Sequence, residues 1–379
     1  MSAPRIILMY ISEVSGHHSA TVAVEKAIKE LSPQAEVLNI NAFNYTNPVS
    51  EKVVNKLYMS VIQGAPAIWD YLYDNPKIVE KINQLKNFVH KFNSPKFKRL
   101  FDKFKPHVVA CSQAFPCGMV ADYKKEYFST LPLVAVLTDY VPHSYWIYDD
   151  IDYYITPSNE VSQRLIAKGV NSAKIKSFGI PFDHKFRKSY GRKEVCAKLG
   201  LNPNIFTVLL MGGGQGLGPI KGIVQHLDKV SAPLQEIIVC GTNRKLYKKL
   251  KRETKRCYKK IHLLGYANNI NELMDASDVI ITKPGGITSS EALCKNLPMI
   301  IVKPIPGQEV NNTDYLTSRK SAIKITRLEE VEMVVENFIR HPHRLREFRQ
   351  ACARISKPDS SLDIAKLLLD LGQRYAQGG

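Results

Sequence analysis

Short apolar runs that alternate with helical segments constrain the fold of this chain more than any other feature. Each run is three to seven residues long, which suits a strand buried on both faces. Buried strands that alternate with helices form parallel sheets covered by helices. The runs are 5–11, 37–40, 107–111, 133–138 and 153–156, then 206–211, 236–240, 262–264, 279–282 and 299–302. We therefore predict an α/β protein with two Rossmann-like domains that face each other across a cleft.

The domain boundaries follow from a stretch rich in proline and glycine between the two series of strands. At 379 residues the chain has the length of two ordinary domains. A last helical stretch has its leucines and isoleucine on one face, so we expect it to pack back on the first domain. The predicted parts are a first domain at 1–182, a linker at 183–200, a second domain at 201–357 and a C-terminal helix at 358–379.

Charge is distributed unevenly along the chain. The net charge of +18 favours a polyanionic partner, either nucleic acid or an anionic membrane surface. The parts before and after residue 184 carry about +3 and +15. The run 244–260 holds ten basic residues against Glu253, and it is either a docking surface or a solvated helix face. The stretch 77–105 interleaves basic residues with phenylalanines, which fits an interfacial membrane helix or a helix whose phenylalanines belong to a core.

Cysteines and apolar segments limit the cellular setting. The seven cysteines include no C-x-x-C pair, so we expect neither a disulfide framework nor a metal site. No apolar stretch reaches the roughly 18–20 residues that span a bilayer. The sequence therefore predicts a cytoplasmic protein, and any contact with a membrane is expected to be peripheral.

A glycine-rich loop follows the first strand of the second domain. Residues 211–219 read Met-Gly-Gly-Gly-Gln-Gly-Leu-Gly-Pro and precede a helix. Glycines let the backbone approach a phosphate, and a helix N-terminus offers unpaired N–H groups, although a tight turn without a ligand is the alternative. The next strand lacks the acid of a nicotinamide dinucleotide site, and no P-loop motif is present. The candidate ligand-binding residues after these two strands are Gly213, Gly214, Gln215, Gly241 and Asn243.

Two further turns in the second domain carry polar groups. The first, 283–292, reads Lys-Pro-Gly-Gly-Ile-Thr-Ser-Ser-Glu-Ala. Its donors suit a pyrophosphate, and its glutamate, one helical turn later, can accept both hydroxyls of a ribose. The second, 304–312, can grip sugar hydroxyls or serve as a polar capping loop. The candidates are Gly285, Gly286, Thr288 and Glu291 in the first turn, and Gln308, Glu309 and Asn312 in the second.

The first domain offers a histidine and a carboxylate, each close to the end of a predicted strand. His17 lies in the sequence Ser-Gly-His-His-Ser, and Asp139 lies in Leu-Thr-Asp-Tyr-Val-Pro-His. A neutral imidazole can accept a proton from a hydroxyl nucleophile, and a nearby carboxylate can orient it. His17 is the candidate base and Asp139 is its orienter or an alternative base, although a histidine after a glycine is often only a turn residue.

The order and spacing of these motifs resemble those of the diacylglycerol glycosyltransferases. This is the family of monogalactosyldiacylglycerol synthases and processive diacylglycerol glucosyltransferases, similar to glycosyltransferase family 28. The resemblance runs from about residue 6 to 322. It is carried by Ser-Gly-His at 15–17, Thr-Asp-Tyr at 138–140 with His143 and Trp146, Gly-Ile-Pro at 179–181, Gly-Gly-Gly at 212–214, Ala-Ser-Asp at 276–278, Thr-Lys-Pro-Gly-Gly at 282–286 with Glu291, and Pro-Gly-Gln-Glu at 306–309.

The resemblance implies a GT-B fold, a UDP-sugar in the second domain, a lipid acceptor in the first, and inversion at the anomeric carbon without a catalytic metal. It implies that His17 is the base, Glu291 the ribose-binding acid, and Gln308 with Glu309 the sugar-contacting pair. Gly285, Gly286 and Thr288 would form the diphosphate loop. Gly265 and Tyr266 match the region that meets the uracil. Because His18 duplicates the key histidine, His17, His18 and Asp139 all stay candidates for the base.

The function expected from the resemblance is transfer of glucose or galactose from a UDP-sugar to 1,2-diacylglycerol at the inner face of a membrane. The UDP-sugar would be a substrate, no cofactor is expected, and the partners would be diacylglycerol and an anionic membrane surface. One alternative is a related enzyme that acts on a lipid-linked cell-envelope precursor, and another is a UDP-sugar epimerase. A nucleic-acid-binding protein is a more remote alternative, because no recognised binding motif accompanies the charge.

Overall fold

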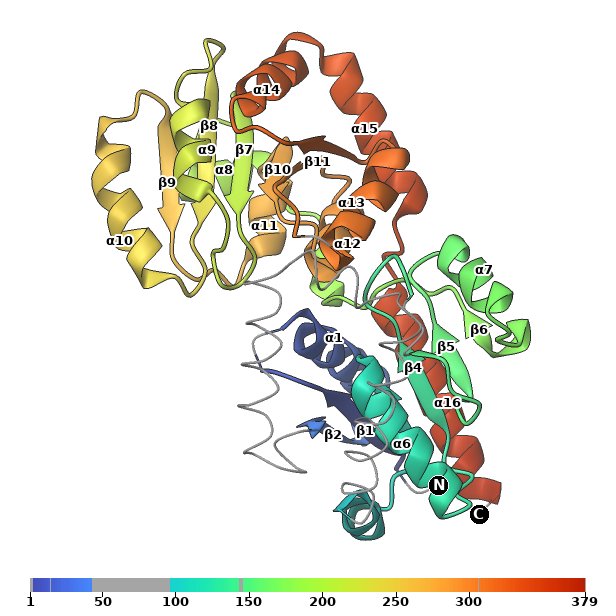
Figure 1. Ribbon diagram of the computed structural model, residues 1–379. Helices are drawn as coiled ribbons and strands as arrows, with labels where there is room; N and C mark the ends of the chain where they lie inside the picture. Colours follow the sequence, from blue (N-terminus) through green and yellow to red (C-terminus); the bar gives the residue numbers. More distant parts are fainter. Residues whose placement is uncertain (1–2, 14, 43–95, 143–145, 306, 379) are drawn as a thin grey trace. The chain divides into compact units, whose positions relative to one another are not determined.

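A computed structural model describes residues 3–13, 15–42, 96–142, 146–305 and 307–378 (Figure 1). Most of the basic and aromatic stretch 77–105, as well as His143, lies outside these residues. The chain divides into two compact units. The first comprises Met1–His184, Ile305–Gln308 and Asp359–Gly379, and the second comprises Lys185–Pro304 and Glu309–Pro358.

The first unit contains a parallel sheet with helices on both faces. Its strand order is β2-β1-β3-β4-β5-β6, so the order along the sheet reverses between β1 and β3. The strands are β1 (Arg5–Tyr10), β2 (Glu36–Asn41), β3 (Val108–Cys111), β4 (Leu133–Val136), β5 (Tyr153–Ile155) and β6 (Ile175–Lys176). The longer helices are α1 (Gly16–Leu31), α6 (Ala114–Glu126), α7 (Asn159–Ala167) and α16 (Ser360–Gly378).

The C-terminal helix α16 covers one face of this sheet together with α1. Ile364, Ala365 and Leu368 are fully buried and pack in one core with side chains of α1, β1 and β3. At the start of the helix, Ser360 Oγ donates to the carbonyl of Ile180 at 2.9 Å. Because the helix fills a face of the first sheet, the first unit includes both ends of the chain.

The second unit repeats this architecture. Its strand order is β12-β11-β10-β7-β8-β9, all parallel, and the order reverses between β10 and β7. The strands are β7 (Phe206–Met211), β8 (Leu234–Val239), β9 (Lys260–Leu264), β10 (Val279–Thr282), β11 (Met299–Val302) and β12 (Ala322–Ile325). The helices are α8 (Arg192–Leu199), α9 (Ile220–Leu227), α10 (Arg244–Glu253), α11 (Ile270–Asp275), α12 (Gly286–Cys294), α13 (Gln308–Ser318), α14 (Glu330–Arg340) and α15 (Pro342–Ile355). The predicted α/β class with two Rossmann-like sheets is confirmed.

The expected linker at 183–200 is only partly right. Residues 192–199 form α8, in which Val195 and Cys196 are buried, and the second unit already begins at Lys185. The sequence signal was misleading because α8 is short and mostly charged, so its helical pattern is weak. Strands β6 and β12 were also missed, because two- and four-residue strands with lysines give no apolar run.

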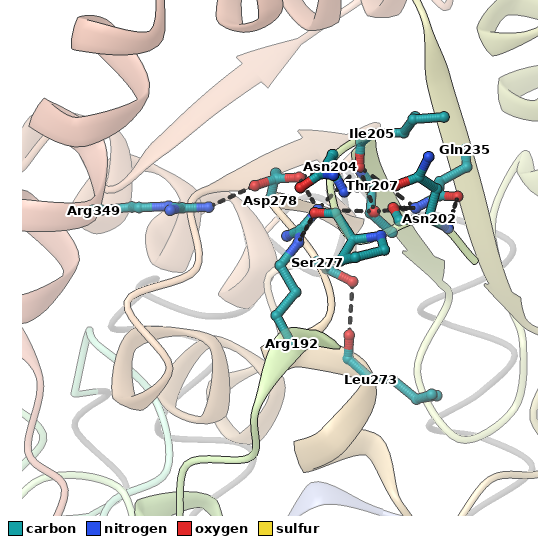
Figure 2. Close-up of polar contacts among 11 residues, drawn as sticks. Arg192, Asn202, Asn204, Ile205, Thr207, Gln235, Leu273, Ser277, Asp278 and Arg349 are labelled. Atoms are coloured by element: carbon teal, nitrogen blue, oxygen red, sulfur yellow. Dashed lines mark hydrogen bonds and ion pairs between the residues drawn. The ribbon is translucent and has the colours of Figure 1, made fainter. Parts of the chain in front are cut away.

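A polar network fixes α8 and α15 to the second sheet (Figure 2). Asp278 Oδ2 accepts from Arg192 Nη2 at 2.8 Å and from the backbone N–H of Thr207 at 2.9 Å. Asp278 Oδ1 accepts from Arg349 Nη2 at 2.8 Å. Figure 2 shows Asp278 between the two arginines. The Ala-Ser-Asp motif at 276–278 therefore has a structural role, which is to join three elements at the start of β10.

Among the described residues, no helix is both long enough and apolar enough to cross a bilayer.

Candidate active site

Both sheets place polar loops at the point where the strand order reverses. In open parallel sheets, ligands bind at the carboxyl ends of the strands on either side of such a point. In the first unit these ends belong to β1 and β3, and the residues that follow them include His17 and Ser112. In the second unit they belong to β7 and β10, which are followed by the two glycine-rich turns. The sequence-predicted residues therefore fall at the expected ligand edge of each unit.

His17 lies in the first turn of α1. Ser15 caps this helix, because its hydroxyl accepts from the N–H of His18. The His17 Nδ1 lies 2.8 Å from the carbonyl oxygen of Ser112, which follows β3. Ser112 holds the same residue a second time, since its Oγ donates to the backbone carbonyl of His17 at 3.0 Å. The ring and the backbone of His17 are thus both fixed by Ser112, which lies across the point where the strand order reverses.

The surroundings of His17 determine its charge and tautomer. Burial lowers the pKa of His17 below its ordinary 6.5, and the negative charge of Asp139 and the hydrogen bond to Ser112 oppose this only in part. The imidazole is therefore neutral at pH 7. Because a carbonyl oxygen can only accept, the single ring proton lies on Nδ1 and the lone pair lies on Nε2. Nε2 forms no hydrogen bond with the residues that the structure describes, so it can accept a proton.

The hydroxyl group of Thr138 lies between His17 and Asp139. Thr138, two residues beyond the end of β4, has its Oγ1 3.0 Å from His17 Nδ1 and 3.5 Å from Asp139 Oδ2. Gln308, which is counted with the first unit, donates from Nε2 to Asp139 Oδ2. The structure thus brings together His17 and Asp139, and it adds Ser112 and Thr138, which the sequence analysis missed. Ser112 directly follows the predicted run 107–111, and Thr138 is the last residue of the predicted run 133–138, which was the available signal.

His18 lies in a separate arrangement on the same helix turn. Its ring stacks on Tyr10 with a centroid distance of 4.3 Å, and its Nδ1 lies 2.8 Å from the carbonyl of Glu13. Tyr10 also donates to Glu13 Oε2 at 2.7 Å. Of the two adjacent histidines, only His17 is held by residues that follow β3 and β4.

The glycine-rich loop after β7 packs against the loop after β8. The carbonyl of Gly214 accepts from the N–H of Thr242 at 2.9 Å. A Cβ on Gly216 would lie 2.0 Å from the carbonyl oxygen of Cys240, and a Cβ on Gly241 would lie 2.2 Å from that of Gly214. Both glycines also have a positive φ. They are therefore required by the fold itself, whatever ligand the loop binds.

At three other positions of this edge, neither close packing against described atoms nor backbone conformation requires a glycine. A Cβ on Gly214, Gly265 or Gly285 would meet no described atom within 4 Å, and none of the three has a positive φ. Gly265 follows β9 and is joined to the glycine loop, because its carbonyl accepts from the N–H of Gly241 at 3.1 Å. Tyr266, next to it, is 67 % exposed. These positions leave the backbone accessible to a bound molecule.

The turn after β10 leads directly into α12. Gly285 is the N-cap and offers no side-chain hydrogen bond to the helix, and no acidic residue lies in the first turn. The first N–H groups of α12 are therefore available to an anion. Thr288 and Glu291 are half-buried and one helical turn apart. Gly286 and Thr288 can thus act as donors, with Glu291 as an acceptor farther along the same helix.

Two residues predicted to bind a ligand instead form hydrogen bonds with the protein backbone. Asn312 is 1 % exposed, and its Nδ2 donates to the carbonyl of Pro284 at 3.0 Å. Asn243 caps α10, accepts from the N–H of Leu246 at 2.9 Å, and donates to the carbonyl of Gly216 at 3.3 Å. The sequence could not reveal this, because an amide at a loop suits a ligand and a neighbouring backbone equally well. Both side chains hold the backbone of the turns at which they lie.

Glu309 and Gln215 complete the predicted set. Glu309 Oε1 pairs with Lys283 Nζ at 2.8 Å, and both side chains are mostly buried. This ion pair connects the first turn of α13 to the turn that precedes α12, and it identifies Lys283 as a further cation at this edge. Gln215 is exposed within the glycine loop. Eight predicted groups therefore converge on the carboxyl edge of the second sheet: Gly213, Gly214, Gln215, Gly265, Tyr266, Gly285, Thr288 and Glu291.

Comparison with known proteins gives matches to both units. Residues 17–182 match the family described as monogalactosyldiacylglycerol (MGDG) synthase, and residues 207–367 match the glycosyltransferase family 28 C-terminal domain. A processive diacylglycerol beta-glucosyltransferase of Bacillus subtilis is 29 % identical over 330 residues, which cover 86 % of this chain and 85 % of the relative.

Solved structures resemble the fold. MurG of Acinetobacter baumannii has a TM-score of 0.65 and 13 % identity, and the match covers 97 % of this chain and 99 % of MurG. MnaA of S. aureus, solved with UDP, has a TM-score of 0.63 and 12 % identity, and the match covers 95 % of this chain and 94 % of MnaA. At these identities the likeness concerns the fold alone.

Proposed function

The chain belongs to the diacylglycerol glycosyltransferases, and from this premise we propose that it transfers a hexose from a UDP-sugar to the free hydroxyl of 1,2-diacylglycerol with inversion at the anomeric carbon. The observation that carries the proposal is the state of His17. It is a neutral imidazole with its proton fixed on Nδ1 and its Nε2 lone pair available, at the ligand edge of the unit that matches the MGDG synthases.

The proposed reaction is a single displacement. His17 Nε2 accepts the proton of the diacylglycerol hydroxyl as its oxygen forms a bond to the anomeric carbon. The bond from that carbon to the diphosphate oxygen breaks, and UDP leaves with the electron pair. Asp139 stabilises the imidazolium that forms, and Thr138 lies between the two groups. Attack from the face opposite the leaving group gives inversion.

The second unit supplies the proposed donor site. The free N–H groups at the start of α12 and the accessible backbone at Gly214 and Gly285 suit a diphosphate, whose developing charge they would stabilise. Glu291 would accept from the ribose hydroxyls, and Tyr266 would contact the uracil. Gln308 and Glu309 would contact the hexose. We propose that these donors make a resident metal or cofactor unnecessary, and unchanged activity in excess EDTA is the expected result.

The proposed place of action is the surface of an anionic membrane, with the enzyme bound peripherally from the cytoplasmic side. Its acceptor is a lipid with two acyl chains, which enters water too rarely to be used from solution. The net charge of +18 supports an anionic surface.

The test is incubation of the protein with diacylglycerol vesicles and either UDP-glucose or UDP-galactose, followed by mass analysis of the lipids. We expect a glycolipid from one of the two donors, and the coupling constant of its anomeric proton reports inversion. The mass also gives the number of sugars added. Absence of glycolipid from both donors refutes the proposal. Conversion of the UDP-sugar to an isomer without acceptor would indicate an epimerase instead.

A further inference from the structure

The helix α10 and the residues that follow it expose basic side chains along one edge of the second unit. Figure 1 shows α10 beside β9, the edge strand of its sheet. The exposed basic residues of this segment are called the basic edge, and they are Arg244, Lys245, Lys248, Lys249, Lys251, Arg252, Lys255, Arg256 and Lys260.

The basic edge carries uncompensated charge. None of its side chains forms an ion pair with any residue that the structure describes. The one acid of the segment, Glu253, pairs instead with Lys221 of α9 at 3.0 Å. Exposed cations on other helices do have partners at helical spacing, such as Lys198 with Glu194 and Arg374 with Asp370. Like charges four residues apart disfavour a helix, so α10 retains this pattern against its own stability.

Packing determines which side of α10 faces outward. Leu250 is buried, and Leu246 and Tyr247 pack against the same core of the second sheet. The apolar side of α10 is therefore occupied by its own sheet, and the basic side faces outward. The following turn is anchored as well, because Asp228 Oδ1 accepts from the N–H groups of Tyr258 and Lys259 at 2.7 and 3.0 Å. Tyr258, between two residues of this segment, is 94 % exposed beside the basic edge.

This surface suits an anionic lipid headgroup layer. Lysines and arginines on one face are attracted by the negative surface potential, and an exposed tyrosine is favoured at the boundary between headgroups and water. The surface is less suited to single-stranded nucleic acid, because binding of single strands requires several aromatic side chains on which bases stack. Tyr258 is the one strongly exposed aromatic side chain in the segment 244–260. We infer that the basic edge of the second unit is a docking surface for an anionic bilayer, an inference that rests on the proposed use of a lipid acceptor.

The binding test uses the full-length protein and sedimented vesicles of phosphatidylcholine, with or without 30 mol % phosphatidylglycerol. The test variant combines Lys248→Gln, Lys249→Gln and Arg252→Gln. The control combines Lys193→Gln, Arg346→Gln and Arg354→Gln, which removes the same charge from other exposed positions of the second unit. Since each basic residue near an anionic surface contributes a factor of about five, the test variant is expected to bind anionic vesicles about 100-fold more weakly. The control variant should lose less than about threefold.

Equal losses in the two variants would show that only net charge matters and would overturn the inference. It would also be overturned if the test variant kept its vesicle affinity but no longer bound single- or double-stranded oligonucleotides. Circular dichroism melting of both variants excludes unfolding as the cause, because all six replaced side chains are exposed.

An activity test separates this inference from the proposed function. A short-chain diacylglycerol that dissolves as a monomer serves as acceptor without a membrane. The test variant should use it as well as the parent protein does, and it should be at least tenfold slower on diacylglycerol in anionic vesicles. If the parent protein glycosylates neither acceptor, the proposed function fails. If parent and variant glycosylate the vesicle acceptor equally, the docking surface is refuted while the function stands.

Discussion

Glu236 gives the sharpest quantitative prediction. It lies in β8 with 0 % of its surface exposed, and neither carboxylate oxygen has a hydrogen-bond partner among the described residues. Burial, with a smaller contribution from the charge of Asp228, raises the pKa of Glu236 from 4.5 to about 8, and Lys259 opposes the shift. In the folded protein the group is therefore protonated at neutral pH, whereas in the unfolded chain it is ionised.

The sign and size of the effect follow from proton linkage. The folded state binds the proton more tightly, so the contribution of Glu236 to stability is fully present below pH 4.5 and is lost as the pH rises toward 8. One unit of pKa difference corresponds to about 1.4 kcal/mol. Glu236 alone should therefore lower the free energy of unfolding by about 3 kcal/mol between pH 5 and pH 7.5. Glu236→Gln removes the titration and keeps the shape, so its stability relative to the parent should rise by about 3 kcal/mol over that range.

The assay has to report on the second unit. Both tryptophans, Trp69 and Trp146, precede residue 184, so their fluorescence does not report on it. Cys240 follows β8 and is fully buried. Urea titrations at fixed pH, read by pulsed thiol labelling of Cys240 and peptide mass analysis, therefore follow unfolding of the relevant sheet. Glu347→Gln, at an exposed position, is the control and should show no pH-dependent difference.

The reasoning is refuted if the stability difference between Glu236→Gln and the parent is the same at pH 5 and pH 7.5. A constant offset between the two proteins is compatible with it, because a buried amide without partners has its own pH-independent cost.

Three further predictions concern the site and the fold. His17→Gln should lower kcat by at least 100-fold and leave UDP affinity, measured by calorimetry, within about twofold; because burial lowers the pKa of His17, the acid limb of the parent's kcat/KM profile should lie below pH 6.5. Glu291→Gln should weaken UDP binding about tenfold with a smaller change in kcat, and an unchanged UDP affinity would contradict the ribose contact. Asp278→Ala should cost about 3 kcal/mol in the Cys240 labelling assay, because Arg192 and Arg349 lose their carboxylate partner and the N–H of Thr207 loses its acceptor.

Most of the fold was accessible from the sequence because buried parallel strands leave a strong local signal. All ten predicted runs correspond to strands, with ends that differ by at most a few residues. The misses, β6, β12 and α8, are short elements with polar or charged residues, and their conformation depends on neighbours distant in the sequence. The apolar face of α16 was also visible, because leucines at helical spacing must be covered by something.

The sequence predicted where the candidate site residues lie better than it predicted what each side chain does. Loops after strands lie at one edge of a parallel sheet, so His17, the two glycine turns and Glu291 could be assigned to that edge from their order alone. The same argument gave no way to separate Asn312, which is buried and supports a turn, from Gln215, which is exposed. That difference depends on which backbone atoms each side chain meets.

The sequence by itself therefore determined the α/β architecture, the family and the sheet edge at which the candidate residues of each unit lie, since these depend on periodicity and on the order of motifs. Only the tertiary structure distinguished His17 from His18, by placing the Ser112 carbonyl and the Thr138 hydroxyl next to one ring and Tyr10 with Glu13 next to the other. It also showed that, among the described residues, the basic side chains of α10 form no ion pair and face outward, while Glu236 is buried without a hydrogen-bond partner. Burial and hydrogen bonding set the charge of a titratable group, and both arise from residues far apart in the chain.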